Sequence, residues 1–332
     1  MLQIYCALKP LLSIFELNIF IIFNGKTLAL LVVGSVALDS VETPFDKVDD
    51  ALGGSATYIS LAASYFSGPI GLVGVVGDDF PGKYIELLEQ HNVDLEGMQI
   101  IEGEKTFRWG GKYHYDLNVR DTLFTELNAF QNFNPIIPER FRKSRYICLG
   151  NIDPILQIRV LEQMINPQFV VCDTMNFWIT GMKDDLIKLL KRVNVFIIND
   201  SEARLLTEEP NLIKAAKKIR ELGPEILIIK KGEHGAMLFT EGTIFSAPAY
   251  PMEVIFDPTG AGDTFAGGFI GYLHQTRDLS PENIKRAVIY GSAMASFCVE
   301  KFSTKGLEDL SYLQIQDRFR EFRKISSFDE SN

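Results

Sequence analysis

The chain has 332 residues, with 33 Lys and Arg against 43 Asp and Glu, and its formal net charge is −10. This acidic balance argues against a nucleic-acid partner. With 46% hydrophobic and 23% charged residues, the composition is typical of a globular protein and excludes a disordered, collagenous or coiled-coil chain. The 4 Cys form no Cys-x-x-Cys pair and there are only 4 His, so we expect buried free thiols in the reducing cytoplasm and no zinc site.

The first 26 residues precede the first clear structural element. Residues 11–23 are strongly apolar, but Glu16 and Asn18 interrupt them, and the run is shorter than the roughly 20 residues that a membrane helix needs. A basic segment and a small-residue cleavage site, which mark a secretory signal, are missing from this stretch. We therefore expect no membrane span and interpret residues 1–26 as an extension outside the fold.

Short apolar runs then alternate with amphipathic segments. The runs are typical of strands buried on both faces, and they cover residues 28–34, 70–76, 146–150, 169–173, 195–199 and 226–230. Helical patterns separate them at residues 56–66, 82–91, 156–165, 184–192, 201–206 and 211–222. This alternation predicts a parallel sheet with helices on both faces. Ligands of such folds bind outside the carboxyl ends of the strands.

Two regions, at about 40–52 and 104–127, break this alternation and favour β-structure. Within the second region, Gly110-Gly111 is a signal for a two-residue hairpin turn. Aromatic residues occupy alternate positions around it and would share one face of a strand; they are Phe107, Trp109, Tyr113 and Tyr115. We predict a small second sheet, which is either a lid over a ligand or a surface for packing and dimer contact.

The most informative segment is DPTGAGDTFAGG at residues 257–268. A strand-like run at 250–256 leads into it, and a helical pattern follows. Gly260 and Gly262 leave backbone N–H groups free to bind an anion at a helix N-terminus. Asp263 would repel a bound phosphate, but it fits a base that accepts the proton of a hydroxyl attacking that phosphate. The alternative is a plain helix cap after a glycine-rich turn.

These residues resemble a known family. DPTGAGDTFAGGF resembles the C-terminal signature of the PfkB (ribokinase-like) family of small-molecule kinases. Further matches follow along the chain from about residue 28 to residue 322: Gly53-Gly54-Ser55-Ala56-Thr57 resembles the family's N-terminal glycine pair, Asn199-Asp200-Ser201-Glu202 its NxxE motif, and Lys231-Gly232-Glu233-His234-Gly235 its nucleotide-side glycine turn. The resemblance implies a ribokinase-like three-layer α/β/α fold, with a mostly parallel central sheet and a small β-sheet lid. The kinase domain would span 27–325, followed by a tail at 326–332.

The resemblance also implies roles for the residues near the phosphates. Asp263 would be the catalytic base, and the amides of Gly260, Ala261 and Gly262 would form an anion hole. Asn199 and Glu202 would organise Mg²⁺ through its waters, although both residues are also typical of a helix cap. ATP would further contact Lys231, Gly232, Gly235 and Ser292. The family often carries a monovalent-cation site, which here allows K⁺ near Asp257 and Thr259.

On the acceptor side, Asp39 resembles the carboxylate that accepts hydrogen bonds from sugar hydroxyls, and Gly53 and Gly54 would let the backbone approach the ring. Asn151 and Asn176 stand at strand ends where they would bind a polyol, or they are ordinary turn residues. The hairpin residue Arg108 would neutralise phosphate charge as a lid closes, or it is a solvated surface arginine.

The resemblance implies an ATP-dependent kinase that phosphorylates the hydroxymethyl group of a sugar, with a nucleoside kinase as the alternative. A sugar or nucleoside sensor without turnover is the alternative from another class. A dinucleotide-dependent dehydrogenase is disfavoured because no GxGxxG follows the first strand. We expect a small-molecule substrate, no nucleic-acid or membrane partner, a cytoplasmic location, and lid edges that allow a homodimer.

Overall fold

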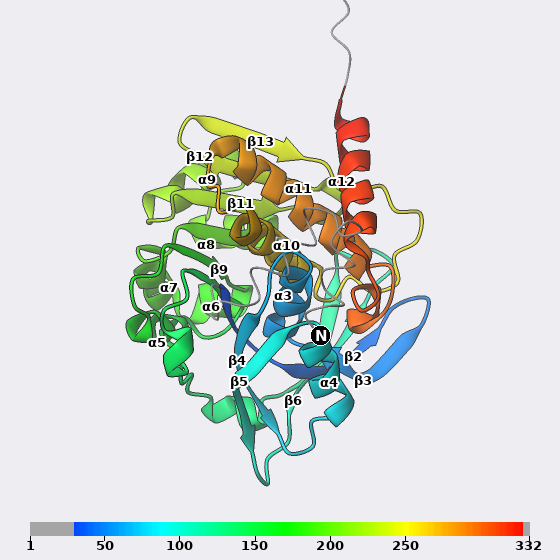
Figure 1. The fold of residues 1–332 in the computed structure, drawn as a ribbon. Helices are drawn as coiled ribbons and strands as arrows, with labels where there is room; N and C mark the ends of the chain where they lie inside the picture. Colours follow the sequence, from blue (N-terminus) through cyan, green and yellow to red (C-terminus); the bar gives the residue numbers. More distant parts are fainter. Residues whose placement is uncertain (1–29, 328–332) are drawn as a thin grey trace, which may run out of the picture.

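The computed structural model describes residues 30–327 of the chain (Figure 1). The predicted extension at residues 1–26 and most of the predicted tail lie outside the described residues. Cys6 also lies outside them. The other three cysteines, Cys148, Cys172 and Cys298, are buried free thiols, as predicted.

The predicted parallel sheet is confirmed. It has nine strands in the order β13-β12-β11-β10-β9-β8-β1-β4-β5. Neighbouring strands are parallel except at β11-β12-β13, where the pairing is antiparallel. The strands are β1 (Leu30–Val33), β4 (Ile70–Gly77), β5 (Val93–Ile101), β8 (Tyr146–Leu149), β9 (Phe169–Asp173), β10 (Val195–Asn199), β11 (Ile226–Lys230), β12 (Ala236–Thr240) and β13 (Thr243–Ala247).

Two hydrophobic cores lie on opposite faces of this sheet. Successive side chains of a strand point to opposite faces, so in β1 Leu30 and Val32 join one core while Leu31 and Val33 join the other. This explains why the strand sequences are continuously apolar rather than alternating.

Helices cover both faces. The first core is closed by α3 (Ser55–Ser64), α4 (Gly82–Gln90), α10 (Ala261–Thr276), α11 (Pro281–Cys298) and α12 (Tyr312–Ser326). The second is closed by α5 (Pro154–Gln163), α7 (Lys183–Leu190), α8 (Asp200–Thr207) and α9 (Leu212–Glu221), and the short α6 (Asn176–Gly181) follows β9. Figure 1 shows α3, α10 and α11 packed side by side, and this stack brings the N-terminus of α10 to the carboxyl ends of the strands.

A second sheet of four strands stands beside the main one in the order β3-β2-β6-β7. Its strands are β2 (Ala37–Glu42), β3 (Lys47–Gly53), β6 (Phe107–Tyr113) and β7 (Arg120–Glu126), and we call it the lid. The prediction of a hairpin turn at Gly110-Gly111 is wrong. Both glycines lie inside β6, and the turn falls between Tyr113 and Arg120.

Close side-chain packing explains these two glycines better than a turn does. A Cβ atom at Gly110 would overlap the ring of Phe124 on β7, and one at Gly111 would overlap the ring of Trp109. The sequence signal for two positions without side chains was therefore real, but its cause is the space taken by the rings of Phe124 and Trp109 rather than positive φ.

Some elements of the structure differ from those predicted. The strand-like run at 250–256 forms no strand, and Pro251 within it lacks the N–H that a ladder needs. The strands β5, β12 and β13 and the helix α12 were not anticipated. None of the helices within residues 30–327 is long and apolar enough to cross a membrane.

Candidate active site

The loop that contains Gly260 leads directly into α10. Gly260 adopts φ 75°, in the left-handed region, and a Cβ there would overlap the ring of Tyr58 from α3. Only glycine fits both restrictions. The tight turn leaves the first N–H groups of α10 without helical partners, as an anion-binding site requires.

Asp263 lies in the first turn of α10 and keeps part of its surface exposed. Its pKa is raised to about 7: burial, and after it repulsion from Asp173, raise the pKa, whereas Lys230 and Arg120 lower it. A carboxylate with this pKa is half protonated near neutral pH, which suits a group that takes up a proton during a reaction.

A largely buried ion pair joins the carboxyl ends of β9 and β11, the two strands on either side of β10. Lys230 is the last residue of β11 and Asp173 the last of β9, and Lys230 Nζ donates to Asp173 Oδ2 at 2.9 Å. The Asp173 side chain is 6% exposed and that of Lys230 18%. Buried charges of this kind are stable only as a pair.

Asn199 and Glu202 form a capping box at the start of α8, as their alternative interpretation predicted. The Asn199 side chain accepts from the Glu202 N–H at 2.8 Å, and Glu202 Oε2 accepts from the Asn199 N–H at 2.9 Å. Burial nevertheless raises the pKa of Glu202 to about 7, with a contribution from Asp173. The cap thus uses only the Oε2 atom of Glu202, and the charge of this carboxylate acts on Asp263.

A cavity of about 610 Å³ opens between the carboxyl ends of the strands, α10 and α11. Six of the residues predicted to bind ATP or form the anion hole line it: Asn199, Gly232, Gly235, Ala261, Gly262 and Ser292. Lys230, from the ion pair above, also lines the cavity, as do residues 115–118 between β6 and β7. The lid therefore reaches this cavity, which we call the main cavity.

The predicted acceptor residues near the first glycine pair come together. Asp39 on β2 is 7% exposed, and a Cβ at Gly53 would overlap its carboxylate. The pKa of Asp39 is raised to about 7: burial and repulsion from Asp257 and Asp263 raise the pKa, and the hydrogen bond from the N–H of Gly54 lowers it. Asp39 and Asp263 are thus close enough to influence each other, which puts both in one electrostatic site.

The two asparagines at strand ends have protein partners. Asn151 Oδ1 accepts from the indole N–H of Trp178 at 3.0 Å. Asn176 is exposed at the start of α6, and its Oδ1 accepts from the N–H of Phe177 at 3.0 Å. Asn151 thereby fixes Trp178 beside the ends of β8 and β9.

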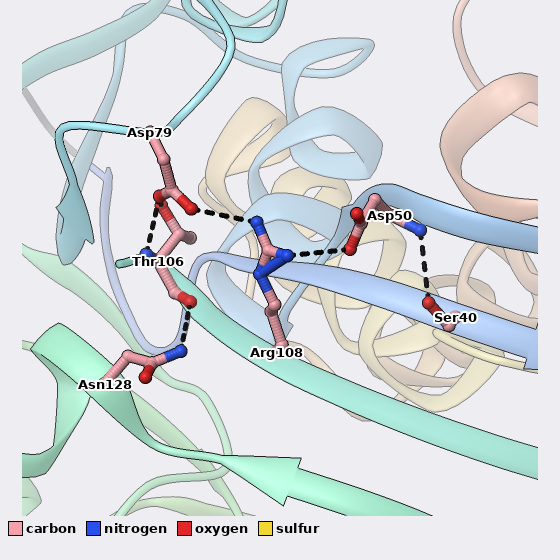
Figure 2. A network of polar contacts seen from close by, with 6 residues as sticks. All are labelled: Ser40, Asp50, Asp79, Thr106, Arg108 and Asn128. Carbon is pink, nitrogen blue, oxygen red and sulfur yellow. Dashed lines mark hydrogen bonds and ion pairs between the residues drawn. The ribbon is translucent and has the colours of Figure 1, made fainter. Parts of the chain in front are cut away.

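Arg108 lies on the opposite face of the lid from Asp39. Figure 2 shows Arg108 between two carboxylates: Nη2 donates to Asp79 Oδ2 at 2.8 Å and Nη1 to Asp50 Oδ1 at 3.1 Å. Asp79 also accepts from the N–H and hydroxyl of Thr106, each at 2.7 Å. Arg108 therefore connects lid strands to the turn after β4, and its charge is already paired.

Arg120, on β7, is the lid arginine whose charge acts on Asp263 and Glu202. Its guanidinium lies 5.2 Å from the ring centre of Trp109, and Nη1 is 3.5 Å from the hydroxyl of Tyr113. Trp109 and Asp39 are register partners on β6 and β2. Because successive side chains of a strand point to opposite faces, Asp39 and Trp109 lie on the inward face of the lid and Arg108 lies on its outward face.

The lid also contacts the loop before α10. Thr259 Oγ1 donates to the hydroxyl of Tyr113 at 3.2 Å, and both residues are buried. Asp257, 1% exposed, accepts from the N–H groups of Thr259 at 2.8 Å and Ser303 at 3.0 Å. The nearby hydroxyl of Tyr58 has no hydrogen-bond partner among the described residues.

Comparison with known proteins identifies the family. Residues 29–309 match the model of the pfkB family carbohydrate kinases. The chain is 30% identical over 257 residues to a cytidine kinase of Thermococcus kodakarensis, covering 76% of this chain and 91% of the relative. It is 25% identical over 312 residues to a nucleoside kinase of Methanothermobacter thermautotrophicus, covering 83% and 91%.

The chain belongs to the pfkB carbohydrate kinase family. It is a phosphotransferase with an alcohol group as acceptor. Solved structures share the fold: the Methanocaldococcus jannaschii nucleoside kinase has a TM-score of 0.73 at 19% identity, covering 90% of this chain and 100% of its own, and Arabidopsis thaliana ribokinase has 0.72 at 21%, covering 89% and 99%. The predicted ribokinase-like fold with its lid is therefore confirmed, and the family excludes a dehydrogenase.

Three residues of this PfkB-family site were not anticipated: Asp173, Lys230 and Arg120. Tyr113 was predicted among the lid aromatics, but its contact with Thr259 was not. Asp173 and Lys230 carry a readable signal, since a charged residue ends each of the apolar runs FVVCD and ILIIK. Charge at the carboxyl end of a buried strand faces the ligand edge of the sheet. For Arg120 and Tyr113 the deciding information is the strand register, which the sequence does not display.

Proposed function

We propose that this kinase transfers the γ-phosphoryl group of ATP to the hydroxymethyl group of a sugar. The observation that carries the proposal is Asp263, a carboxylate with pKa raised to about 7 in the first turn of α10, directly after the turn at Gly260. The main cavity beside it is lined by glycines such as Gly232 and Gly262 together with larger side chains such as Tyr115, Tyr250 and Phe265.

In this mechanism Asp39 accepts hydrogen bonds from the acceptor and orients its hydroxyl. Asp263 takes the hydroxyl proton as the oxygen attacks the γ-phosphorus in line. The N–H groups of residues 260–262 donate to the phosphoryl oxygens, where negative charge increases in the transition state. The lid contact between Tyr113 and Thr259 closes the site against water, which would otherwise hydrolyse ATP.

The acidic residues fit Mg²⁺ bound with the nucleotide. Among residues 30–327 there is no group of three or more His, Cys, Asp and Glu side chains that could hold a metal ion, so most ligands would be phosphate oxygens and waters, as Mg²⁺ prefers. Glu202 would hold those waters through its uncapped oxygen. When bound, the ion neutralises phosphate charge.

We also propose a K⁺ site at Asp257 and Thr259. Asp257 is buried, its pKa is raised by that burial, and its charge helps to raise the pKa of Tyr58, whose hydroxyl has no hydrogen-bond partner among the described residues. A monovalent cation would stabilise the carboxylate at this position. Turnover measured in KCl and in NaCl at equal ionic strength tests the proposal, and equal rates would contradict it.

A nucleoside is the second candidate acceptor. Phe177, 62% exposed, and Trp178, fixed by Asn151, give an aromatic surface beside the ends of β8 and β9. Such a surface can stack on a nucleobase. The relatives described above, named cytidine kinase and nucleoside kinase, also favour this candidate.

One experiment separates the two acceptors and tests the base. The purified protein is given ATP, Mg²⁺ and K⁺ with a panel of free sugars and nucleosides, and each phosphorylated product is identified by mass spectrometry. Asp263→Asn should lower kcat by about 10²- to 10⁴-fold while retaining ATP binding. A variant with wild-type turnover would contradict the role of Asp263.

We further propose that two copies associate through their lids in the cytoplasm. Strand β7 is an edge of the lid and is exposed along its whole length, with Leu123 56% and Phe124 39% exposed. An exposed apolar edge strand is a pairing surface. Sedimentation should give a dimer that Leu123→Glu converts to a monomer, and a wild-type monomer would contradict the proposal.

A further inference from the structure

Lys230 is a partly buried cation that lines the main cavity. It ends β11, and its register partner on the neighbouring parallel strand is Asn199. Its ammonium group makes a hydrogen bond to Asp173, which uses one of its three N–H donors. Two donors therefore remain beside the cavity that Lys230 lines.

The ammonium group lies against the backbone of the predicted anion hole. A Cβ built on Gly262 would be 2.7 Å from Lys230 Nζ, so the cation and the first turn of α10 face the same small volume. A cation next to a helix N-terminus is unfavourable because the helix dipole is positive there. An anion placed between the two would be stabilised by both, and Asp173 holds the ammonium there in the absence of that anion.

We propose that Lys230 is a catalytic residue whose ammonium group contacts the transferring γ-phosphoryl group, and that Asp173 is its positioning residue. The proposal rests on the kinase mechanism given above. The bond from the acceptor oxygen to the γ-phosphorus forms as the bond to the β,γ-bridging oxygen breaks. The acceptor proton goes to Asp263, and Lys230 stays protonated throughout.

This role differs from that of the amides. Backbone N–H groups supply partial charges, whereas Lys230 supplies a full charge that strengthens its interaction as the phosphoryl oxygens become more negative. The same ammonium lowers the pKa of Asp263, and Asp173 raises it. The charged groups facing Asp263 are Asp39, Asp173, Lys230, Arg120 and Glu202.

The first test measures contact without turnover. Isothermal titration with Mg²⁺ compares a non-hydrolysable ATP analogue with ADP in the wild type and in Lys230→Met. A contact to the γ-phosphoryl group predicts about 10- to 100-fold weaker binding of the analogue, and a much smaller change for ADP. Equal losses for the two ligands would overturn the proposal, and so would no loss for either.

The second test measures the reaction. Lys230→Met should lower kcat by about 10²- to 10³-fold, as loss of one transition-state donor does, with a smaller change in KM for ATP. Lys230→Arg should recover part of the rate. The low-pH limb of kcat/KM should move to higher pH in Lys230→Met and to lower pH in Asp173→Asn.

Controls separate this role from a structural one. Lys230→Met leaves Asp173 buried and unpaired, so the double variant Lys230→Met/Asp173→Asn restores charge balance and folding; its kcat should stay low. Wild-type kcat in that double variant would mean that the pair is only structural. Lys188→Met, which breaks a surface ion pair with Asp185, should keep full activity. An inactive wild type would contradict the kinase mechanism itself, while the titration would still decide the γ-phosphoryl contact.

Discussion

At the scale of the residue, three carboxyl groups of this kinase share one property. Burial raises the pKa of Asp39, Glu202 and Asp263 to about 7 in each case. They also repel other carboxylates of the site. Ionising all of these carboxyl groups at once is therefore unfavourable in the ligand-free protein. Cations that arrive with the nucleotide would relieve that repulsion.

The pH dependence of the rate follows from Asp263. A base must be unprotonated to accept the acceptor's proton, so kcat/KM should fall as the pH drops below about 7, the pKa of this group in the free enzyme. With an ordinary aspartate as the base, kcat/KM would fall only near pH 4. A pH profile of kcat/KM measured at low concentrations of both substrates, where the free enzyme predominates, checks this, and a value that stays constant down to pH 5 would contradict it.

At the scale of the element, the two faces of the lid have different roles. Its outward face carries Arg108 in ion pairs that connect the lid to the turn after β4 (Figure 2). Its inward face carries Tyr113 and Arg120 toward the loop before α10. Strand β6, which carries both Arg108 and Tyr113, therefore both anchors the lid and extends into the candidate active site.

Arg120→Gln should lower kcat by about ten-fold, because a solvent-exposed charge acting at the phosphates contributes less than a buried donor. The affinity for ATP should weaken only slightly. The matched control is Asp121→Asn. Asp121 is the next residue on β7 and pairs with His114 of the lid. Steady-state kinetics of both variants would contradict a role for Arg120 if their kcat values agree.

At the scale of the whole molecule, the active site costs stability. A group whose pKa is higher in the folded than in the unfolded protein binds its proton more tightly on folding. Asp39, Glu202 and Asp263 therefore favour folding at low pH, and this contribution is lost as the pH rises from about 4 through about 7.

The ligand-free protein should accordingly gain stability when its active-site acids are neutralised. At pH 8, Asp263→Asn should raise the free energy of unfolding by about 1 to 3 kcal/mol, and the gain should shrink at pH 5. Thermal denaturation at the two pH values measures this. A lower Tm of the variant at pH 8 would contradict the prediction, and Asp317→Asn on the surface of α12 is the control.

The sequence by itself determined the fold class and the glycine-rich loop before α10, because both are local patterns. Strands buried on two faces must be apolar throughout, and the glycines and Asp263 of the anion loop are neighbours in the chain. The tertiary structure alone decided the rest of the site. The pairing of Lys230 with Asp173 joins residues far apart in sequence, and the inward position of Arg120 instead of Arg108 depends on strand register, which one residue of slip reverses.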